Sequence, residues 1–220
     1  MGIETQPPIF WSTVQNHQEE IWSAKYIQID NFISQAENKK ILKSVIAQES
    51  KFIPTKHGGK SDLETRHSKV LPLSINDCEY ISKKIDVLLP DILSKLGVSR
   101  FSLEKIEGQV TAHNDGHFYR IHRDNGNINL ASRKLTYVYY FHRQPKCFLG
   151  GELILYDYKK DAGIYIQAET FKTIKRRNNS IVFFLSDFMH EVLPVVCPSQ
   201  AFVDSRFTIN GWIHQPNLQK

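Results

Sequence analysis

The sequence predicts a mostly β fold, a sandwich or barrel of the jelly-roll kind, braced by helices from the N-terminal part of the chain. After residue 100 the chain breaks into short β-rich runs with turn residues between them at near-regular spacing, which is typical of that architecture. Before residue 100, apolar residues recur at intervals of three to four, which indicates helices with one buried face. We expect a single domain over residues 1–220, with 1–100 as a helical support region and 101–214 as the β core.

Two segments of the first hundred residues carry the helical pattern. Residues 31–48 place apolar side chains along one face, and Ser34 is a candidate N-cap. Residues 76–96 repeat the pattern and close at Gly97, while Pro90 inside them predicts a kink or a split. We expect both helices to brace one face of the sheet.

The elements after residue 100 are strands, assigned to runs of β-branched and aromatic residues between turn signals. Gly150 and Gly151 lie before one of these runs, where a tight turn needs a positive φ and no direct chemistry is implied. The predicted strands are 105–112, 118–122, 134–142, 152–156, 165–166, 171–174, 180–185, 191–196 and 206–214.

Composition excludes several classes of protein. Of the 220 residues, 41% are hydrophobic and 23% charged, which excludes wholesale disorder. The longest nearly apolar stretch, 180–188, is less than half the length of a membrane-spanning helix, and residues 1–11 lack the pattern of a secretory signal. Three widely spaced cysteines fit neither a disulfide framework nor a zinc site. We therefore expect a cytoplasmic protein that does not bind membranes.

The charge pattern argues against a nucleic-acid-binding protein. The net charge is only +5, and the basic residues are scattered instead of forming a stripe with interleaved aromatic residues. The densest basic cluster, within residues 172–177, adjoins a predicted turn and is best explained as a solvated loop.

One constellation in the β-rich part carries chemistry. His122 and Asp124 are two residues apart on or beside a predicted strand, so their side chains should share a face, and His190 follows 66 residues after Asp124. Two imidazoles and a carboxylate form the facial triad of non-haem Fe(II) oxygenases, which leaves positions open on the metal. Arg206 and Thr208 come next and could hold one carboxylate together. The alternatives are a hydrogen-bonded His–Asp pair, an ordinary barrel histidine and a structural ion pair at Arg206.

The chain resembles the 2-oxoglutarate/Fe(II)-dependent dioxygenases, in particular their prolyl 4-hydroxylase-like branch. The resemblance covers about residues 105–214 and is specific for the family while saying little about the substrate. It implies a double-stranded β-helix core, that is, a jelly-roll or cupin-like fold. Its elements, all in the family's order, are 119–124, 133–140, 150–153, 190–195 and 206–212.

The resemblance implies roles for individual residues. His122, Asp124 and His190 would be the iron ligands, with no catalytic residue beyond them. Arg206 would pair with the distal carboxylate of the cosubstrate 2-oxoglutarate, whose keto acid end chelates the iron. Oxidative decarboxylation of the keto acid would then supply the oxidant, since cofactors carry the difficult chemistry and the protein places the reactants.

Three further cosubstrate contacts follow from the resemblance. Tyr140 occupies the position of a tyrosine that bonds the same distal carboxylate, although a core tyrosine is the alternative. Thr208 could assist Arg206. Where relatives often place a tyrosine on the strand before the His-x-Asp motif, the nearest candidate here is His113.

Some segments could shape the substrate pocket. Two stretches, 56–66 and 115–118, are candidate lids over the mouth of the barrel. Val192 and Trp212 are candidates for its lining, with ordinary core packing as the alternative.

The sequence therefore predicts a 2-oxoglutarate-dependent dioxygenase that uses Fe(II), 2-oxoglutarate and O₂, with ascorbate as a reductant. It would hydroxylate an unactivated carbon of a peptidyl, prolyl-like substrate or of a free amino acid or natural-product intermediate, releasing succinate and CO₂. Desaturation or ring closure would use the same ligands. The protein would be a monomer or homodimer. The competing hypothesis is a non-catalytic barrel that binds or senses 2-oxoglutarate or iron.

Overall fold

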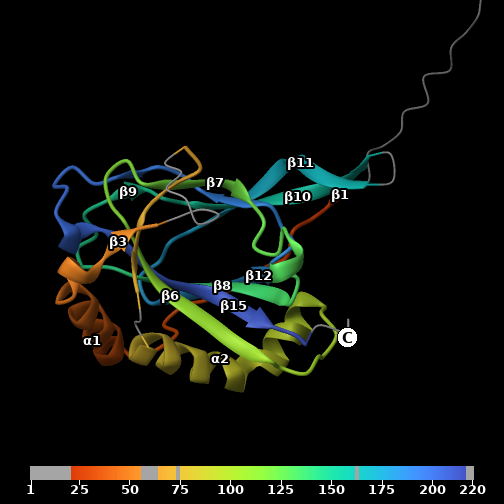
Figure 1. Cartoon of the computed structure of the whole chain (residues 1–220), viewed down its shortest axis with the longest axis horizontal. Coiled ribbons are helices and arrows are strands. Elements are labelled where there is room, and N and C mark those ends of the chain that lie inside the picture. The colour runs from red at the N-terminus through yellow and green to blue at the C-terminus, as the bar shows by residue number, and fades with distance from the viewer. Residues whose placement is uncertain (1–20, 56–63, 73–74, 162–163, 217–220) are drawn as a thin grey trace, which may run out of the picture.

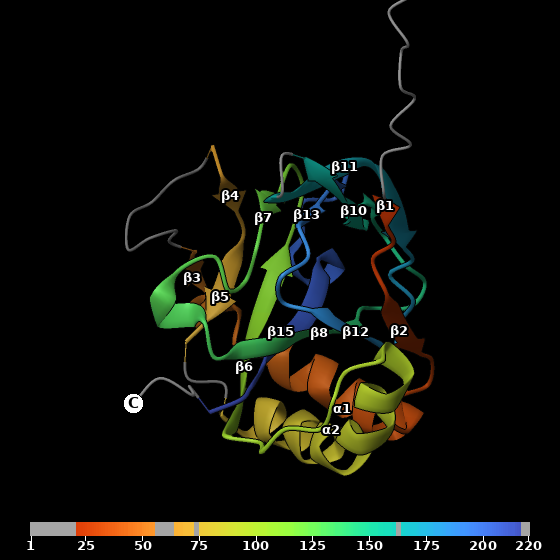
Figure 2. The same cartoon turned by 90° about the vertical axis from the view of Figure 1, so that its right-hand side faces the viewer.

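The computed structural model describes residues 21–55, 64–72, 75–161 and 164–216. Within these ranges the chain forms two layers of antiparallel strands, with both α-helices on the outer side of one layer (Figure 1 and Figure 2). This arrangement confirms the predicted mostly β, jelly-roll-like fold with helices bracing one face. Neither α1 nor α2 combines the length and the hydrophobicity that crossing a bilayer would take.

The larger sheet carries the helices and has seven strands in the order β2-β12-β8-β15-β6-β5-β3. Its long central strands match the sequence prediction closely, because β12 and β15 have the predicted bounds and β6 and β8 differ by a single residue at one end or at both. The strands are β2 (Tyr26–Ile29), β3 (Ile53–Pro54), β5 (Lys69–Leu71), β6 (Lys105–His113), β8 (Arg133–Phe141), β12 (Ser180–Leu185) and β15 (Arg206–His214).

The second sheet faces the first and has six strands. Its path is β1-β10-β13-β7-β4, with β11 also paired to β10. A separate two-stranded sheet joins β9 (Leu149–Gly150) to β14 (Val195–Val196). The strands of the six-stranded sheet are β1 (Ile21–Trp22), β4 (Arg66–His67), β7 (Phe118–His122), β10 (Leu153–Asp161), β11 (Ile164–Ile174) and β13 (His190–Val192).

The helices are α1 (Gln35–Ile46) and α2 (Ile75–Leu96), accompanied by three short 3₁₀ turns, Glu49–Lys51, Ile128–Leu130 and Phe202–Asp204. The predicted N-cap is confirmed, since the Ser34 hydroxyl accepts from the Glu37 N–H and the Glu37 carboxylate accepts from the Ser34 N–H. The predicted split at Pro90 is wrong, because α2 runs through it. Asp86 and Pro90 both lie on the exposed face, where solvent can bond the carbonyl that proline leaves unpaired.

The period-two alternation of β8 divides the interior into two clusters. Tyr137, Tyr139 and Phe141 point to the helices and join a cluster that runs from Phe32 in the N-terminal part to Ile213 near the C-terminus. The intervening side chains, including Val138 and Tyr140, point to the other sheet. Each central strand therefore has one face in the core and one face toward the space between the sheets.

The same alternation makes β15 a wall of that space. Phe207 and Ile209 pack into the helix-side cluster, whereas Arg206, Thr208 and Trp212 line a cavity between the two sheets. The fold thus places every second residue of its last strand at one internal site.

Several of the predicted elements differ from the structure, among them the strand predicted at 152–156, which is β10 and runs from Leu153 to Asp161. The first hundred residues are not only helical, because their short strands β2, β3 and β5 extend one sheet and β1 and β4 extend the other. Residues 165–166 and 171–174 belong to one long strand, β11, whose exposed edge needs few apolar residues. Residues 191–196 form two strands, β13 and β14, interrupted around Pro194.

Two glycines allow β6 and β15 to approach each other. Gly108 and Gly211 are direct cross-strand partners. A Cβ on Gly211 would lie 1.9 Å from the Glu107 carbonyl oxygen and 2.8 Å from the Gly108 Cα, so no side chain fits there. The close contact fixes the register that brings Arg206 opposite His113.

We predict that Gly211→Ala lowers the free energy of unfolding by at least about 2 kcal/mol, because the clash is with backbone that cannot move aside. Urea denaturation measures this change. Gly126→Ala is the control, since its added Cβ would meet its nearest neighbour at 3.6 Å, an ordinary contact. Equal stability of the two variants would show that the strands separate without cost.

Candidate metal centre

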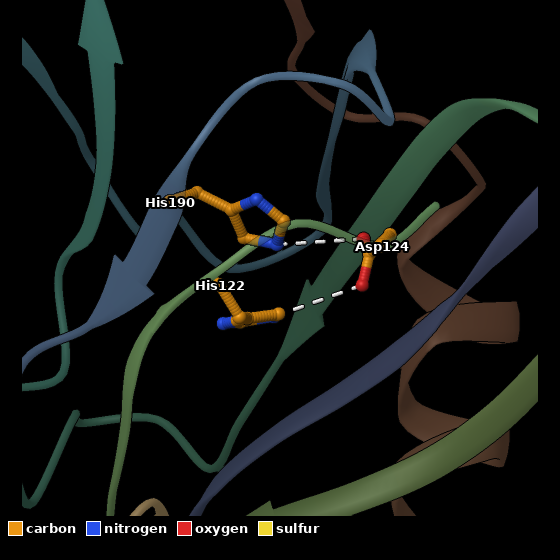
Figure 3. Close-up of side chains that lie close together, drawn as sticks. All are labelled: His122, Asp124 and His190. Carbon is orange, nitrogen blue, oxygen red and sulfur yellow. Dashed lines mark ion pairs between the residues drawn. The ribbon is translucent and has the colours of Figure 1, made fainter. Parts of the chain in front are cut away.

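Three side chains from neighbouring strands of the smaller sheet converge at one end of the space between the sheets. His122 is the last residue of β7, Asp124 follows two positions later, and His190 is the first residue of β13. His122 and His190 are direct cross-strand partners, so the antiparallel pairing itself places the two imidazoles together. Figure 3 shows both rings directed at the Asp124 carboxylate.

The three groups are close enough to share one ion. The His122 Nε2 lies 3.6 Å from Asp124 Oδ1, and the His190 Nε2 lies 3.4 Å from Asp124 Oδ2. One donor atom from each residue lies within 4.8 Å of the others. Asp124 and His190 are buried and His122 is nearly so, which shields the site from bulk water.

Hydrogen bonds fix the tautomer of both histidines. The Nδ1 of His122 is 2.7 Å from the Arg120 carbonyl oxygen, and the Nδ1 of His190 is 2.8 Å from the Phe188 carbonyl oxygen. A carbonyl can only accept, so each Nδ1 carries a hydrogen, and Nε2 is the atom of each ring that can offer a lone pair to a metal. This is the donor arrangement that a divalent metal requires.

The electrostatics of the cluster favour an ionised carboxylate. Burial by itself would raise the pKa of Asp124, but His190, His122 and the Thr136 hydroxyl together hold it below its usual value. Burial and the neighbouring His190 lower the pKa of His122 to about 3, so this ring is neutral at physiological pH. Burial would likewise lower the pKa of His190, but the Asp124 carboxylate outweighs it and raises that pKa.

A pair of hydroxyls holds the carboxylate in place. The Thr136 hydroxyl on β8 donates to Asp124 Oδ2 at 2.7 Å and lies 3.0 Å from the Ser186 hydroxyl, from which it can accept. The Asp124 N–H donates to the Ser186 carbonyl. The carboxylate is therefore oriented from the opposite sheet as well as from its own.

Arg206 lies in the same cavity, buried at the start of β15. Its Nη1 donates to His113 Nδ1 at 3.3 Å, which leaves the hydrogen of that imidazole on Nε2. Burial lowers the pKa of His113 well below its ordinary value, and the charge of Arg206 lowers it further, so His113 is a neutral donor.

Several buried polar atoms around Arg206 are unsatisfied. Among the described residues, Arg206 Nε and His113 Nε2 have no hydrogen-bond partner, and the Tyr140 hydroxyl interacts only with the Arg206 side chain. The Tyr140 ring lies beside the guanidinium, with 5.1 Å between its centroid and the Arg206 Cζ. Because leaving buried donors unpaired is costly, the cluster suits an anionic ligand that accepts from all three.

The remaining predicted residues are placed as follows. Thr208 lines the cavity next to Arg206, but its hydroxyl donates to Asn210 Oδ1 at 3.2 Å. Val192 and Trp212 also line the cavity, as predicted for them. Gly151 has the predicted positive φ and also leaves room for the arginine, since a Cβ there would lie 2.8 Å from Arg206 Cδ.

One cavity of about 510 Å³ is lined by the His122–Asp124–His190 cluster and by Arg206. A site of this size holds a small ligand between a metal and a guanidinium. The structure therefore brings together the residues that the sequence assigned to one site.

Tyr119 is a site residue that sequence reasoning missed. Its ring stacks on His122, with 3.5 Å between centroids and 19° between planes. Residues three apart on a regular strand face opposite ways, but the β7–β13 pairing contains a register shift between its His190 and Val192 pairs, which brings Tyr119 to the same side. A bulge of this kind leaves no signal in the pattern of residue types.

The two segments predicted as candidate lids differ in what the structure says of them. Residues 56–63 of the first one lie outside the described residues, although Arg66 at its end lines the cavity. The second, 115–118, is not supported: Asp115 and His117 line a different cavity, and the Asp115 carboxylate accepts from the Cys197 N–H at 2.8 Å.

Comparison with protein families agrees with this geometry. Residues 108–214 match the model of the 2OG-Fe(II) oxygenase superfamily. The chain is 43% identical over 210 residues to an uncharacterized PKHD-type hydroxylase of Synechocystis sp., a match that covers 92% of this chain and 68% of that protein.

Solved structures share the fold. A prolyl-4-hydroxylase of Pseudomonas putida has a TM-score of 0.63 at 20% identity, covering 88% of this chain and 94% of the other. A prolyl hydroxylase of Trichoplax adhaerens, in complex with a peptide fragment of hypoxia inducible factor, has a TM-score of 0.65 at 21% identity, covering 86% and 83%.

We predict that Thr136→Val weakens the affinity for a divalent metal by roughly tenfold to a hundredfold, because the Asp124 carboxylate loses the donor that orients it. Anaerobic titration with Fe(II) measures the affinity. Thr173→Val is the control, because it also removes a threonine hydroxyl but at an exposed position of β11 outside the site. This variant should leave the affinity unchanged. An unaltered affinity in Thr136→Val would show that the carboxylate needs no support from β8.

Proposed function

The chain belongs to the 2OG-Fe(II) oxygenase superfamily, in its prolyl 4-hydroxylase-like branch, and from this premise we propose that it hydroxylates an unactivated carbon while converting 2-oxoglutarate to succinate and CO₂. Membership makes the chain a hydroxylase that uses Fe(II), 2-oxoglutarate and O₂. The observation that carries the proposal is that the cluster of His122, Asp124 and His190 and the buried Arg206 line one cavity.

His122, Asp124 and His190 would hold Fe(II). The fit rests on this chain's own geometry: a ligand atom from each of the two imidazoles and from the carboxylate lie together, and both Nδ1 atoms are tied to backbone carbonyls. Nitrogen and oxygen donors of this kind suit Fe(II) and leave coordination positions for other ligands.

Arg206 would bind the distal carboxylate of 2-oxoglutarate, with His113 and Tyr140 as additional donors. The support is that Arg206 and His113 present buried polar atoms without partners among the described residues, and that the buried Tyr140 hydroxyl interacts only with Arg206. Thr208 follows Arg206 by two residues on β15 and would assist it in binding the carboxylate. The Thr208 hydroxyl donates to Asn210, which limits the rotation of the Thr208 side chain. Gly151 keeps the space that the guanidinium occupies.

Bound Fe(II) and 2-oxoglutarate would supply the oxidant through oxidative decarboxylation of the keto acid, and one oxygen atom of O₂ would enter the substrate and the other succinate. The protein's residues position the reactants and restrict water. Tyr119 holds the His122 ring by stacking, and Val192 and Trp212 give the cavity apolar walls. Thr136 keeps the carboxylate aimed at the metal position.

The substrate would be a peptidyl, prolyl-like residue or a small amino-acid or natural-product molecule. Solved structures of similar fold include prolyl hydroxylases, one of them with a peptide bound. Desaturation or ring closure would need the same site. Ascorbate as the reductant, a cytoplasmic location and a monomeric or homodimeric state complete the proposal.

Succinate formation in air with Fe(II), 2-oxoglutarate and ascorbate tests the function. Turnover that depends on both iron and 2-oxoglutarate is expected, and a peptide library or cell extract should then show a gain of one oxygen by mass spectrometry. A protein that binds both ligands but forms no succinate with any extract would be a sensor instead.

We predict that Asp124→Ala abolishes succinate formation and greatly weakens Fe(II) binding, because the one negatively charged ligand is lost. Asp86→Ala, on the exposed face of α2, is the matched control and should behave like the wild type. Anaerobic metal titration and succinate assays make the comparison. Full iron affinity in Asp124→Ala would place the metal elsewhere.

We predict that Arg206→Ala raises the KM for 2-oxoglutarate about a hundredfold, the effect of losing a charge-assisted pair of roughly 2–3 kcal/mol. Arg206→Lys should show a smaller increase, because it keeps the charge and loses the fork. Fe(II) affinity, measured alongside, should change little if the fold is intact. An unchanged KM would mean that another residue binds the distal carboxylate.

A further inference from the structure

The wall of the metal cavity carries more positive charge than the proposed reaction uses. Among the described residues that line it, Asp124 is the one carboxylate, whereas Arg66, Arg123, Arg133 and Arg206 all contribute guanidinium groups. Of the three histidines that line the cavity, His113 is neutral, and His122 and His190 carry no positive charge when they bind a metal. The four guanidinium groups differ in whether a carboxylate pairs with them.

Two of the four are accounted for. Arg206 faces the position proposed for the distal carboxylate. Arg133 lies 3.5 Å from the Glu107 carboxylate, donates to the Asp124 carbonyl at 3.2 Å, and stacks on Trp212 with 3.4 Å between its Cζ and the ring centroid. Arg133 is therefore a structural residue of the wall with a carboxylate partner, which it shares with Lys105.

Arg66 is held in place but not neutralised. Its Nε donates to the Ser68 hydroxyl at 3.0 Å, and its Cζ lies 4.6 Å from the centroid of the Tyr119 ring, which in turn stacks on His122. Within the described part of the chain, no carboxylate forms an ion pair with it. Burial lowers the pKa of Arg66, which shows that its charge is partly removed from water.

The contacts of Arg66 leave some of its N–H groups available. A guanidinium has five N–H donors. The Ser68 bond uses the one on Nε, and the uncharged Tyr119 side chain accepts from the guanidinium as well as covering one of its faces, so N–H groups on the two Nη atoms remain for a ligand. Donors in this planar arrangement match the two oxygens of a carboxylate.

Arg123 lies at the mouth of the same cavity. Its exposed side chain lines both this cavity and a neighbouring one of about 650 Å³, and it makes no ion pair within the described ranges. It can therefore attract an anion that enters from either side.

Binding of Fe(II) and 2-oxoglutarate would add no net negative charge to pair with the remaining arginines. The charges of Fe(II), Asp124, 2-oxoglutarate and Arg206 sum to zero, and Arg133 has the Glu107 carboxylate, shared with Lys105, as its partner. Arg66 would remain as a partly buried cation that makes no ion pair within the described part of the chain, whereas Arg123 is exposed to water at the mouth of the cavity. A partly buried cation without a counter-ion is unfavourable unless a ligand provides one.

We propose that Arg66 and Arg123 form an anion subsite that selects a substrate carrying a carboxylate near the carbon that is hydroxylated. Arg66 binds the carboxylate, and Arg123 guides it into the cavity. The inference rests on the proposed function, because it concerns the substrate of that site. The carboxylate belongs to a free or C-terminal α-carboxyl group or to a neighbouring acidic side chain.

Pairs of small probes that differ by one negative charge test the subsite, whichever substrate the enzyme takes. The full-length protein is loaded with Zn(II) in place of iron and saturated with 2-oxoglutarate, and ligand-observed NMR measures binding. The probes are the N-acetylated common amino acids and their carboxamides, together with N-acetyl dipeptide amides that differ only by Asp against Asn. An N-acetylated phosphoserine amide tests whether phosphate is preferred.

In the wild type, the carboxylate member of at least one pair should bind about tenfold tighter or better than its neutral match. This preference should disappear in Arg66→Gln, fall in Arg123→Gln, and persist in part in Arg66→Lys. Arg100→Gln removes an equal charge at an exposed position outside the cavity and should retain the full preference. Which pair shows the preference identifies the source of the carboxylate.

The proposal is overturned if no probe with a carboxylate binds more tightly than its neutral match. It is also overturned if the preference for the carboxylate probe survives in Arg66→Gln, or if the phosphoserine probe binds more tightly than the carboxylate probes. Metal and 2-oxoglutarate affinities of Arg66→Gln, measured in the same samples, show whether the variant is folded. Succinate formation by the Fe(II)-loaded wild type is assayed separately. Its absence would defeat the proposed function, whereas its presence without an anion preference would defeat the subsite alone.

Discussion

The antiparallel pairing of β7 and β13 is the constraint on which the rest of this structure depends. It sets His122 directly opposite His190 and leaves Asp124 just beyond the strand end, with its carboxylate oxygens 3.6 and 3.4 Å from the two rings. Burying a carboxylate there is unfavourable unless its charge is compensated. Two imidazoles and the Thr136 hydroxyl provide that compensation, and the same contacts aim the three donors at one point.

The site is assembled from both sheets because the central strands serve two purposes. Alternate residues of β8 and β15 pack against the helices, and the intervening ones, including Thr136 and Arg206, face the space between the sheets. The close approach at Gly108 and Gly211 fixes the register of β15 against β6 and so brings Arg206 opposite His113. Core packing on one face thereby positions the chemistry on the other.

Sequence patterns were sufficient for the parts of the fold that repeat regularly. The strands that bear His122 and Arg206 and the Ser34 cap follow from spacing and alternation, whereas the resemblance to the dioxygenases is what joined His190 to His122 and Asp124. The patterns failed where a local irregularity or a short partner decides the structure. The bulge that turns Tyr119 toward His122, and the two-residue strand that brings Arg66 to the cavity, depend on tertiary pairing and leave no periodic signal. Likewise, the sequence does not distinguish Thr136 from other threonines on strands, and only its distance to Asp124 identifies its role.

The central claim is that one metal ion is shared by two strands of one sheet while its cosubstrate is held from the other sheet. A crystal structure of the full-length protein, grown without oxygen with Fe(II) and 2-oxoglutarate, tests this most directly. We expect a single iron bound by the Nε2 atoms of His122 and His190 and by the Asp124 carboxylate, with the far carboxylate of 2-oxoglutarate on Arg206. Iron bound elsewhere, or any of the three side chains turned away from it, would contradict the account.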